Sequence, residues 1–305
     1  MNPPRFSVVI PAYNAAGFLT ATLDTVRSQT CRDFEVIVVD DGSKDGTHAV
    51  AAAYLARHGL SGQAILQENK KIAAARNTGM RAASGELIAL LDHDDFWRPE
   101  KLALTAEEFD RHPGTVLVGH HIAVTKDNRP VRILRKGPAV PRMYEQLLLG
   151  ANAVSPSAAV FRRDKALEIG GFREGPEYVT VEDYDFWMRL SRVGPFRFID
   201  AVLSEYPLAE TSASARVGFH HRNLEILLRR HFLEHFGPDP GLLDRIRMRR
   251  RIAAVYRSAL GQLVESKGSP AEAREYALKM LAEFPFSLKN LGRLGQWALS
   301  RILPL

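Results

Sequence analysis

Three carboxylates, Asp92, Asp94 and Asp95, crowd into four residues directly after an apolar run, residues 86–91, that predicts a buried strand. Like charges this close raise the free energy of the folded state unless a cation, solvent or a basic neighbour offsets them. Mg²⁺ and Mn²⁺ prefer oxygen ligands and typically use one or two carboxylates together with substrate phosphates. The cluster therefore predicts a divalent-cation site. The alternative is a solvated loop that precedes a helix starting near Pro99.

Polar residues also follow two earlier apolar runs. Tyr13 comes after the β-branched run 6–10, and Asp41 comes after the run 34–39. In open α/β sheets, ligands bind outside the carboxyl ends of the strands, so these residues and Asp92 would surround one crevice. Common turn chemistry is the alternative explanation for the segment around Asp41. The convergence of several strand ends favours a binding site.

A further acidic pair, Glu182-Asp183, lies far downstream, after the turn Gly170-Gly171-Phe172. Carboxylates near the start of a helix can serve only to stabilise its dipole. A catalytic role would require one of them to lie beside a bound substrate as a general base. Neither a GxGxxG nor a GxxxxGK[ST] pattern follows any predicted strand, which disfavours dinucleotide-binding and P-loop folds. A phosphorylated ligand would therefore have to be held by a cation and side chains.

The elements that must position these residues alternate between strand and helix. They are predicted in turn at residues 6–10, 14–29, 34–39, 47–57, 64–66, 72–83 and 86–91, and shorter elements at 116–118, 122–124, 144–149 and 157–161. Asn14 is the expected N-cap of the first helix. Near-continuous apolar strands separated by helices favour an α/β fold with a parallel sheet covered on both faces.

The chain changes character near residue 217. Apolar residues then recur only at helical spacing, as Leu224, Leu227, Leu228, Phe232 and Phe236 and later as Ile252, Val255, Tyr256, Ala259, Leu260 and Leu263. We predict an α/β domain at residues 1–217 and an all-helical extension at residues 218–305.

Composition indicates an ordinary globular protein, with 46% hydrophobic and 25% charged residues. The single cysteine, Cys31, excludes an intramolecular disulfide framework and suits a reducing compartment. The N-terminus lacks the apolar core of a secretion signal, and no run approaches the roughly 18 apolar residues that span a bilayer. These features predict a cytoplasmic location, with the inner face of the membrane as an additional site.

The net charge of +6 is concentrated near the C-terminus, where five arginines lie within residues 245–251 and the tail from Phe286 has no acid. Nucleic acid, anionic lipid and solubility are the usual reasons for such an excess. The absence of zinc-finger spacing and of RNA-binding aromatic motifs disfavours nucleic acid. The tail also has an apolar helical stripe: Leu288, Leu291, Leu294, Trp297, Ala298, Ile302 and Leu305. Packing on the α/β domain or in a homodimer is the favoured explanation, and peripheral contact with an anionic membrane is the alternative.

Together these residues resemble the family 2 glycosyltransferases from about Phe6 to Trp187. The matching stretches are FSVVIPAYNAAGFL, FEVIVVDDGSKDGT, AAARNTGMRAASGELIALLDHDDFWRPEKL, GGF and VEDYDFWMRL. Their order and spacing agree with the family, which is more specific than any single motif. The resemblance implies a GT-A fold, a Rossmann-like mixed sheet flanked by helices, and leaves the helical extension unassigned.

The resemblance also implies an inverting glycosyltransferase that moves a sugar from a nucleotide-diphosphate sugar to an acceptor hydroxyl. The acceptor would be a glycan or a lipid-linked molecule in cell-surface glycan or glycolipid synthesis. A UDP-sugar is the favoured donor because Asp41 is compatible with a uracil contact, while dTDP and GDP donors stay open. A Mg²⁺ or Mn²⁺ ion would neutralise the leaving diphosphate.

The donor-binding residues of the family correspond to four positions of this chain. By the resemblance, Pro11, Tyr13 and Asp41 would line the nucleotide-base pocket. Arg76 would be a supporting polar residue near the donor.

The resemblance places the metal and the base on the acidic clusters. Asp92 and Asp94 would form the Asp-x-Asp motif, with Asp92 near the ribose or sugar and Asp94 as the preferred metal ligand. Asp95 would cap the following helix. Asp183, or less favourably Glu182, would be the base that deprotonates the acceptor, since an alcohol nucleophile needs a carboxylate within hydrogen-bond reach.

Some segments depart from the family pattern. Lys70 and Lys71 replace glycines that often follow the asparagine at position 69, and Tyr206-Pro207-Leu208-Ala209-Glu210 replaces a Tyr-Arg-x-His-like segment. The absence of a Gln-x-x-Arg-Trp pattern and of membrane helices disfavours a processive synthase. A catalytically silent sugar-nucleotide-binding or scaffold protein with the same fold is the alternative. A nucleotidyltransferase is disfavoured because no glycine-rich basic loop follows the first strand.

Overall fold

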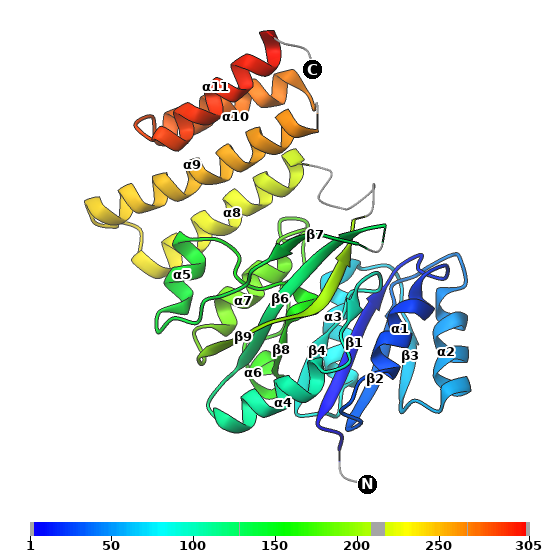
Figure 1. Cartoon of the computed structure of the whole chain (residues 1–305). Coiled ribbons are helices and arrows are strands. Elements are labelled where there is room, and N and C mark those ends of the chain that lie inside the picture. The colour runs from blue at the N-terminus through cyan, green and yellow to red at the C-terminus, as the bar shows by residue number, and fades with distance from the viewer. Residues whose placement is uncertain (1–2, 128, 209–216, 267, 303–305) are drawn as a thin grey trace. The chain divides into compact units, whose positions relative to one another are not determined.

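Two structural units make up the chain in the computed structural model, which describes residues 3–127, 129–208, 217–266 and 268–302, without the side chains of 299–302. The α/β unit comprises Met1–Leu147, Asn152–Glu174 and Glu182–Glu210, and the helical unit comprises Leu148–Ala151, Gly175–Val181 and Thr211–Leu305 (Figure 1). The predicted positions Ala209, Glu210 and Leu305 and the side chain of Ile302 lie outside the described residues. The domain boundary after residue 217 stays a prediction.

The α/β unit is built on a nine-stranded sheet with the order β3-β2-β1-β4-β8-β6-β9-β5 and with β7 paired to β6. Its first half is parallel: β1 Phe6–Ala12, β2 Phe34–Asp40, β3 Gly62–Leu66 and β4 Leu87–Leu90. Strands β1 and β4 are buried along their whole length, as expected for a parallel sheet covered on both faces. These four predicted strands are confirmed, with small shifts at their ends.

The second half of the sheet is mixed. It contains β5 Phe96–Trp97, β6 Leu117–Lys126, β7 Arg129–Leu134, β8 Val160–Arg162 and β9 Phe196–Pro207. Strand β8 runs antiparallel to both β4 and β6, and β6 pairs in parallel with β9. The two short runs predicted at 116–118 and 122–124 are one strand that crosses a register shift at His120/His121.

Short helices surround this sheet (Figure 1): α1 Leu19–Arg27, α2 Thr47–His58, α3 Lys71–Ala82, α4 Lys101–Arg111, α5 Met143–Leu149, η1 Pro156–Ala158, α6 Arg163–Glu168 and α7 Glu182–Leu190. Helix α3 lies unusually close to β1, since a Cβ at Gly79 would be 2.3 Å from Val9 Cγ1. Any larger residue at position 79 would push the two elements apart. This close approach fixes α3, and with it Arg76, against the sheet.

The predicted N-caps of two helices are wrong. Helix α1 begins at Leu19 after Phe18, whereas Asn14 has a φ of 50° and its Oδ1 accepts the Lys44 N–H at 3.1 Å. Helix α4 begins only at Lys101, with Glu100 at the N-cap and no side-chain cap, so Asp95 does not cap it. In both cases tertiary contacts use the polar side chain elsewhere.

The helical unit contains α8 Val217–Phe236, α9 Leu242–Glu265, α10 Pro270–Glu283 and α11 Leu288–Ile302. Helix α9 is central and contacts the other three, which lie beside it in Figure 1. It buries the whole predicted stripe: Ile252, Val255, Tyr256, Ala259, Leu260 and Leu263. Among the described residues, no helix is both long enough and apolar enough to cross a bilayer.

Candidate active site

The ends of three adjacent strands meet at one edge of the sheet. Ala12 pairs with Asp40 across β1 and β2, and Val9 pairs with Leu90 across β1 and β4. Because these strands are parallel neighbours, the residues that follow them, including Asp92, come together at their carboxyl ends. The structure therefore brings the strand-end clusters to one edge, as the sequence predicted.

Arg76 on α3 links two acidic clusters that are far apart in the sequence. Its Nη2 donates to Asp92 Oδ1 and its Nη1 donates to Glu182 Oε1, both at 2.9 Å. The guanidinium is fully buried and lies over the ring of Phe172, 5.4 Å from its centroid. The loop after β4 and the start of α7 are thus held together by one cation.

The bridge between Arg76 and Glu182 buries two ionisable side chains away from water. Burial raises the pKa of Glu182 to about 7, with Asp183 adding to the rise and Arg76 opposing it. Burial works against the charge of Arg76, but Asp92 and Glu182 outweigh it and raise the pKa of Arg76. Glu182 Oε2 and Arg76 Nε are buried and have no hydrogen-bond partner among the described residues. A buried ion pair of this kind is a position where removal of one partner is costly.

Asp183 differs from Glu182 in accessibility. The residue as a whole is half-buried, and its carboxylate accepts the Tyr184 N–H at 2.7 Å and the Asn152 Nδ2–H at 3.2 Å. Burial raises the pKa of Asp183, while Arg76 opposes the rise. Glu182, by contrast, is buried and bonded to Arg76. Of the pair, Asp183 is the more exposed residue, and Arg76 does not hydrogen-bond to it.

The cluster after β4 contains acids in different environments. Asp92 is half-buried, Asp94 is exposed and Asp95 is buried. Desolvation raises the pKa of Asp94, with His93 opposing and Asp92 reinforcing the rise. Burial, and then the charge of Asp92, raise the pKa of Asp95 well above its usual range. Asp94 is therefore the acid of this cluster that faces solvent.

A buried lysine, Lys101, is linked to this cluster through Ser157. Lys101 is fully buried, with Nζ 3.5 Å from the centroid of the Trp97 ring, and burial lowers its pKa well below the usual range while Asp95 opposes this. Lys101 Nζ and Trp97 Nε1 both donate to the carbonyl of Ser157 at 2.8 Å. The Ser157 hydroxyl in turn accepts the Asp92 N–H at 3.0 Å. The backbone at Asp92 is thus fixed by a rigid support.

Asp41 is buried and caps the start of α3. It accepts the N–H groups of Lys70 and Lys71 and the Nε2 of Gln67, each at 2.8 Å. A carboxylate has about four acceptor positions, so these three hydrogen bonds do not use all of them. At the positions where the family often has glycine, the backbone N–H groups of Lys70 and Lys71 therefore hold Asp41 in place. Both lysines are exposed.

The remaining predicted donor residues are Pro11, near the end of β1, and Tyr13, directly after it. Tyr13 is 46% exposed, so its ring is accessible to a ligand, whereas Pro11 is buried. The Pro11 carbonyl lies 3.0 Å from His93 Nδ1, and the His93 ring stacks on Phe18. His93 thus connects neighbouring strand ends.

The carboxylates fit a cation site that a ligand completes. Within the described ranges, no group of three or more His, Cys, Asp or Glu side chains is placed to hold a metal ion. Asp94 has no ion-pair partner among the described side chains, and Asp92 uses one oxygen for Arg76. Because Mg²⁺ commonly combines one or two carboxylates with substrate phosphates, this pair suits a cation that arrives with a diphosphate.

Sequence analysis missed several positioning residues. Ser157 lies outside every quoted stretch, so no motif could have singled it out, whereas Lys101 lies in the quoted stretch that contains the acidic cluster. Asn77 lies within a quoted motif, and its side chain clamps the glycine turn by accepting the Phe172 N–H and donating to the Phe172 carbonyl, both at 2.8 Å. Its place in that motif was the available signal.

Comparisons with known proteins agree with this architecture. Residues 7–170 match the family described as Glycosyl transferase family 2. The amylovoran biosynthesis glycosyltransferase AmsB of Erwinia amylovora is 31% identical over 230 residues, which are 73% of this chain and 74% of AmsB. Other relatives are longer: the chain spans 37%, 37% and 28% of three of them.

Solved structures extend the likeness over almost the whole chain. S. aureus TarS 1-349 in complex with UDP-GlcNAc has a TM-score of 0.66 at 18% identity, covering 97% of this chain and 91% of that one. Mannosyltransferase PcManGT from Pyrobaculum calidifontis, in complex with GDP-Man and Mn²⁺, has a TM-score of 0.58 at 19% identity, covering 100% and 88%. The fold is that of the GT-A glycosyltransferases, as predicted. The chain belongs to glycosyl transferase family 2.

Proposed function

We propose that the α/β unit transfers a sugar, with inversion, from a nucleotide-diphosphate sugar to an acceptor hydroxyl in the synthesis of a cell-surface glycan or glycolipid. The observation that carries this proposal is the Arg76 bridge, which holds the acidic cluster at Asp92 beside the acids at the start of α7. AmsB is named for the biosynthesis of amylovoran, which supports polysaccharide synthesis. TarS was solved with UDP-GlcNAc, which supports a UDP-sugar, while the GDP-Man complex of PcManGT keeps GDP donors open.

Donor binding is assigned to the ends of β1 and β2. The exposed ring of Tyr13 would contact the nucleotide base, with Pro11 beneath it, and Asp41 would use its remaining acceptor position. Arg76 would act by holding Asp92, since the guanidinium is itself buried.

The diphosphate is assigned to Asp92 and Asp94. Asp94 would be the main ligand of a Mg²⁺ or Mn²⁺ ion and Asp92 a donor contact and second ligand. When bound, the cation would neutralise the charge of the leaving nucleotide diphosphate. The Ser157 hydrogen bond to the Asp92 N–H keeps this carboxylate in place before the donor arrives.

Asp183 is the proposed general base. It would accept the proton of the acceptor hydroxyl as the oxygen attacks the anomeric carbon and the nucleotide diphosphate leaves from the opposite face. Asn152 orients this carboxylate by donating to Oδ2. Glu182 is the weaker candidate because Arg76 already occupies it.

A thermal-shift screen of nucleotide diphosphates and their sugars, with and without Mn²⁺, tests the donor site. A ligand that binds only the folded state raises the melting temperature by mass action. We expect a Mn²⁺-dependent rise for uridine nucleotides that Asp94→Asn abolishes. If no nucleotide raises the melting temperature, the assignment of the donor site is wrong. If a nucleotide sugar binds but is neither transferred nor hydrolysed, a silent sugar-nucleotide-binding or scaffold protein is favoured.

A further inference from the structure

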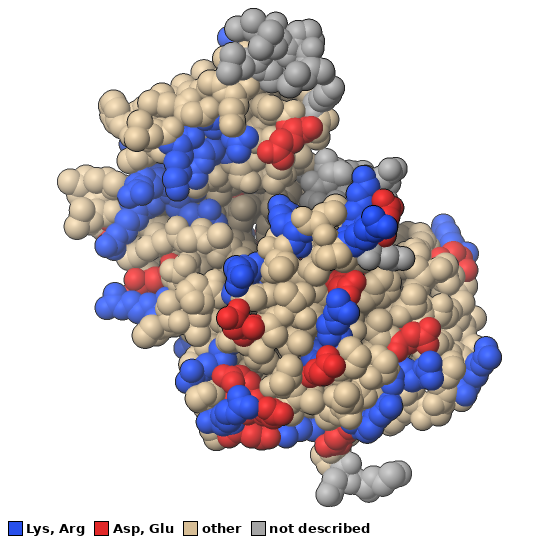
Figure 2. Space-filling model, in the orientation of Figure 1, with Lys and Arg blue, Asp and Glu red and all other residues tan. Residues whose placement is uncertain are grey.

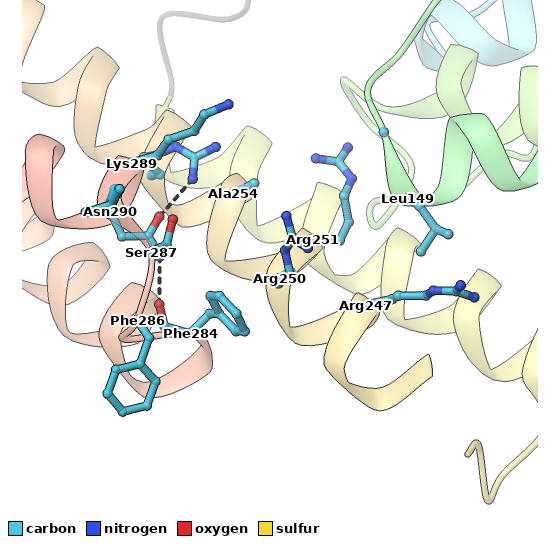
Figure 3. A pocket seen from close by; sticks show the side chains of 13 residues that line it. Leu149, Arg247, Arg250, Arg251, Ala254, Phe284, Phe286, Ser287, Lys289 and Asn290 are labelled. Carbon is cyan, nitrogen blue, oxygen red and sulfur yellow. Dashed lines mark hydrogen bonds between the residues drawn. The ribbon is translucent and has the colours of Figure 1, made fainter. Parts of the chain in front are cut away.

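A basic pocket lies wholly within the helical unit. Its volume is about 750 Å³, and it is lined by α9, by α11, by the segment between α10 and α11, and by residues 149–150. Figure 3 shows arginines of α9 on one side and the segment around Ser287 on the other. The basic lining residues are Arg247, Arg250, Arg251, Arg257 and Lys289. We infer that this pocket and its apolar rim bind the phosphate headgroups of an anionic lipid surface.

The pocket carries charge that its own lining does not neutralise. None of the residues that line it is acidic, and Arg247 pairs with Asp244 from outside the lining at 3.1 Å. Arg257 is half-buried, and its pKa is lowered by burial and by the neighbouring charges of Arg293 and Arg251. Figure 2 shows a run of basic side chains over the helical unit with few acidic atoms among them. An anion in this pocket would relieve the repulsion among these cations.

An apolar rim distinguishes this pocket from a plain phosphate site. Phe286 is 90% exposed and Leu288 is 86% exposed, and both border the pocket. One turn along α11, Leu291 is 52% exposed. Exposed aromatic and aliphatic side chains beside lysine and arginine are the pattern of a helix that lies in a lipid interface.

Other occupants fit this surface less well. A two-fold contact with a second copy would place the same cations against one another, because such an interface is self-complementary. A nucleic acid would satisfy the cations but would leave Phe286 and Leu288 in water. Anionic lipid satisfies both the charge and the apolar rim.

Sedimentation of the full chain with vesicles tests the inference. We expect binding to vesicles of phosphatidylcholine and phosphatidylglycerol in equal parts, and none to phosphatidylcholine alone. About 1 M NaCl, where the Debye length falls to about 3 Å, should weaken the electrostatic part of binding strongly. Absence of binding to the anionic vesicles at low salt would overturn the inference.

Paired variants with equal charge changes locate the site. Arg250→Gln/Lys289→Gln removes two exposed cations of the pocket, and Arg222→Gln/Arg274→Gln removes two exposed cations of the same unit outside it. We expect the pocket pair to bind about 25-fold more weakly than wild type, at roughly fivefold per cation, and the control pair to change much less. Equal losses would show that net charge, and not the pocket, governs binding.

Two further measurements separate the lipid from other anions. Phe286→Ser should weaken vesicle binding without changing the binding of inorganic phosphate, and an unchanged vesicle affinity would overturn the role of the rim. Pocket-dependent binding of inorganic phosphate or of a single-stranded oligonucleotide, without vesicle binding, would overturn the lipid assignment. The nucleotide-dependent thermal shift of the pocket pair should match wild type, since the proposed donor residues belong to the α/β unit and the pocket residues to the helical unit.

Discussion

The two charged regions of this protein differ in how their charge is compensated. In the α/β unit, the acids around the strand ends face a buried cation, Arg76, at 2.9 Å from both Asp92 and Glu182. In the helical unit, the pocket around Arg257 is lined by cations and by no acid. Compensated charge makes a site that is formed before its ligand arrives. A pocket lined by several cations and no acid makes a surface whose repulsion an external anion relieves.

The largest expected effect concerns the reactive acid in the compensated region. Asp183→Asn should lower the rate of sugar transfer by about 10²- to 10⁴-fold, the usual contribution of general-base catalysis. Donor affinity should stay near wild type, because the proposed donor contacts lie at the strand ends. Transfer rates and donor dissociation constants, measured side by side, check this.

Glu182→Gln is the matched comparison for the base. If Glu182→Gln abolishes transfer with donor binding intact while Asp183→Asn retains it, the two roles are reversed. If both variants keep the full rate of sugar transfer, neither acid of α7 is the general base.

Removing the compensating cation is the next largest effect. Arg76→Met leaves Glu182 buried and Asp92 half-buried without their partner, which should lower the free energy of unfolding by about 3–5 kcal/mol. The exposed Arg81 on the same helix is the control, and Arg81→Met should change stability by less than about 0.5 kcal/mol. Denaturation followed by tryptophan fluorescence in a Trp297→Phe background reports on this unit, because Trp97 and Trp187 both lie in it.

A triple change sharpens that measurement. In Arg76→Met/Glu182→Gln/Asp92→Asn the stranded charges are gone, so stability should recover part of the loss. If the triple variant loses as much stability as the three single variants together, the contribution of Arg76 comes from packing and not from charge compensation.

The pH dependence of stability is a smaller effect with a definite sign. The pKa of Glu182 is raised to about 7 from an ordinary 4.5, so the folded state binds more protons than the unfolded state between these values. Glu182 thus contributes stability below about pH 4.5 that is lost as the pH rises through about 7, and we expect roughly 1–3 kcal/mol. In chemical denaturation, the free energy of unfolding of Glu182→Gln should therefore rise relative to that of wild type between about pH 5 and pH 8.

The opposite outcome is informative. A wild type that gains on Glu182→Gln as the pH rises would mean that Arg76 outweighs burial and lowers the pKa of Glu182. The bridge would then hold a fully ionised pair at neutral pH.

The sequence predicted the strand ends because apolar runs end sharply in acids there, as at Asp92. It could not predict β9, whose polar and apolar residues mix and include Asp200. The Arg76 bridge joins residues 16 and 106 positions apart, which local pattern does not encode. The prediction that Asp95 caps a helix was wrong because the sequence does not show that this residue is buried and interacts with Lys101. The roles of Asp41, Asp92, Asp94 and Asp183 stay predictions.

The smallest expected effect lies in the basic pocket of the helical unit. Arg257→Met removes a hydrogen bond to Asn290 at 2.8 Å, and it also removes a cation whose pKa is lowered by burial, Arg293 and Arg251. The lost hydrogen bond costs about 0.5–1.5 kcal/mol. Relief of repulsion offsets it, so stability should change by less than about 1 kcal/mol in either direction.

Hydrogen exchange of peptides from α9 and α11 measures this change without interference from the α/β unit, with Arg222→Met as the exposed control. The same substitution thus costs several kcal/mol at Arg76 and almost nothing at Arg257, because only the first strands buried carboxylates. A loss at Arg257 as large as that at Arg76 would mean that the helical unit depends on its arginines for folding. The pocket would then be part of the core, and its charge would no longer point to an external anion.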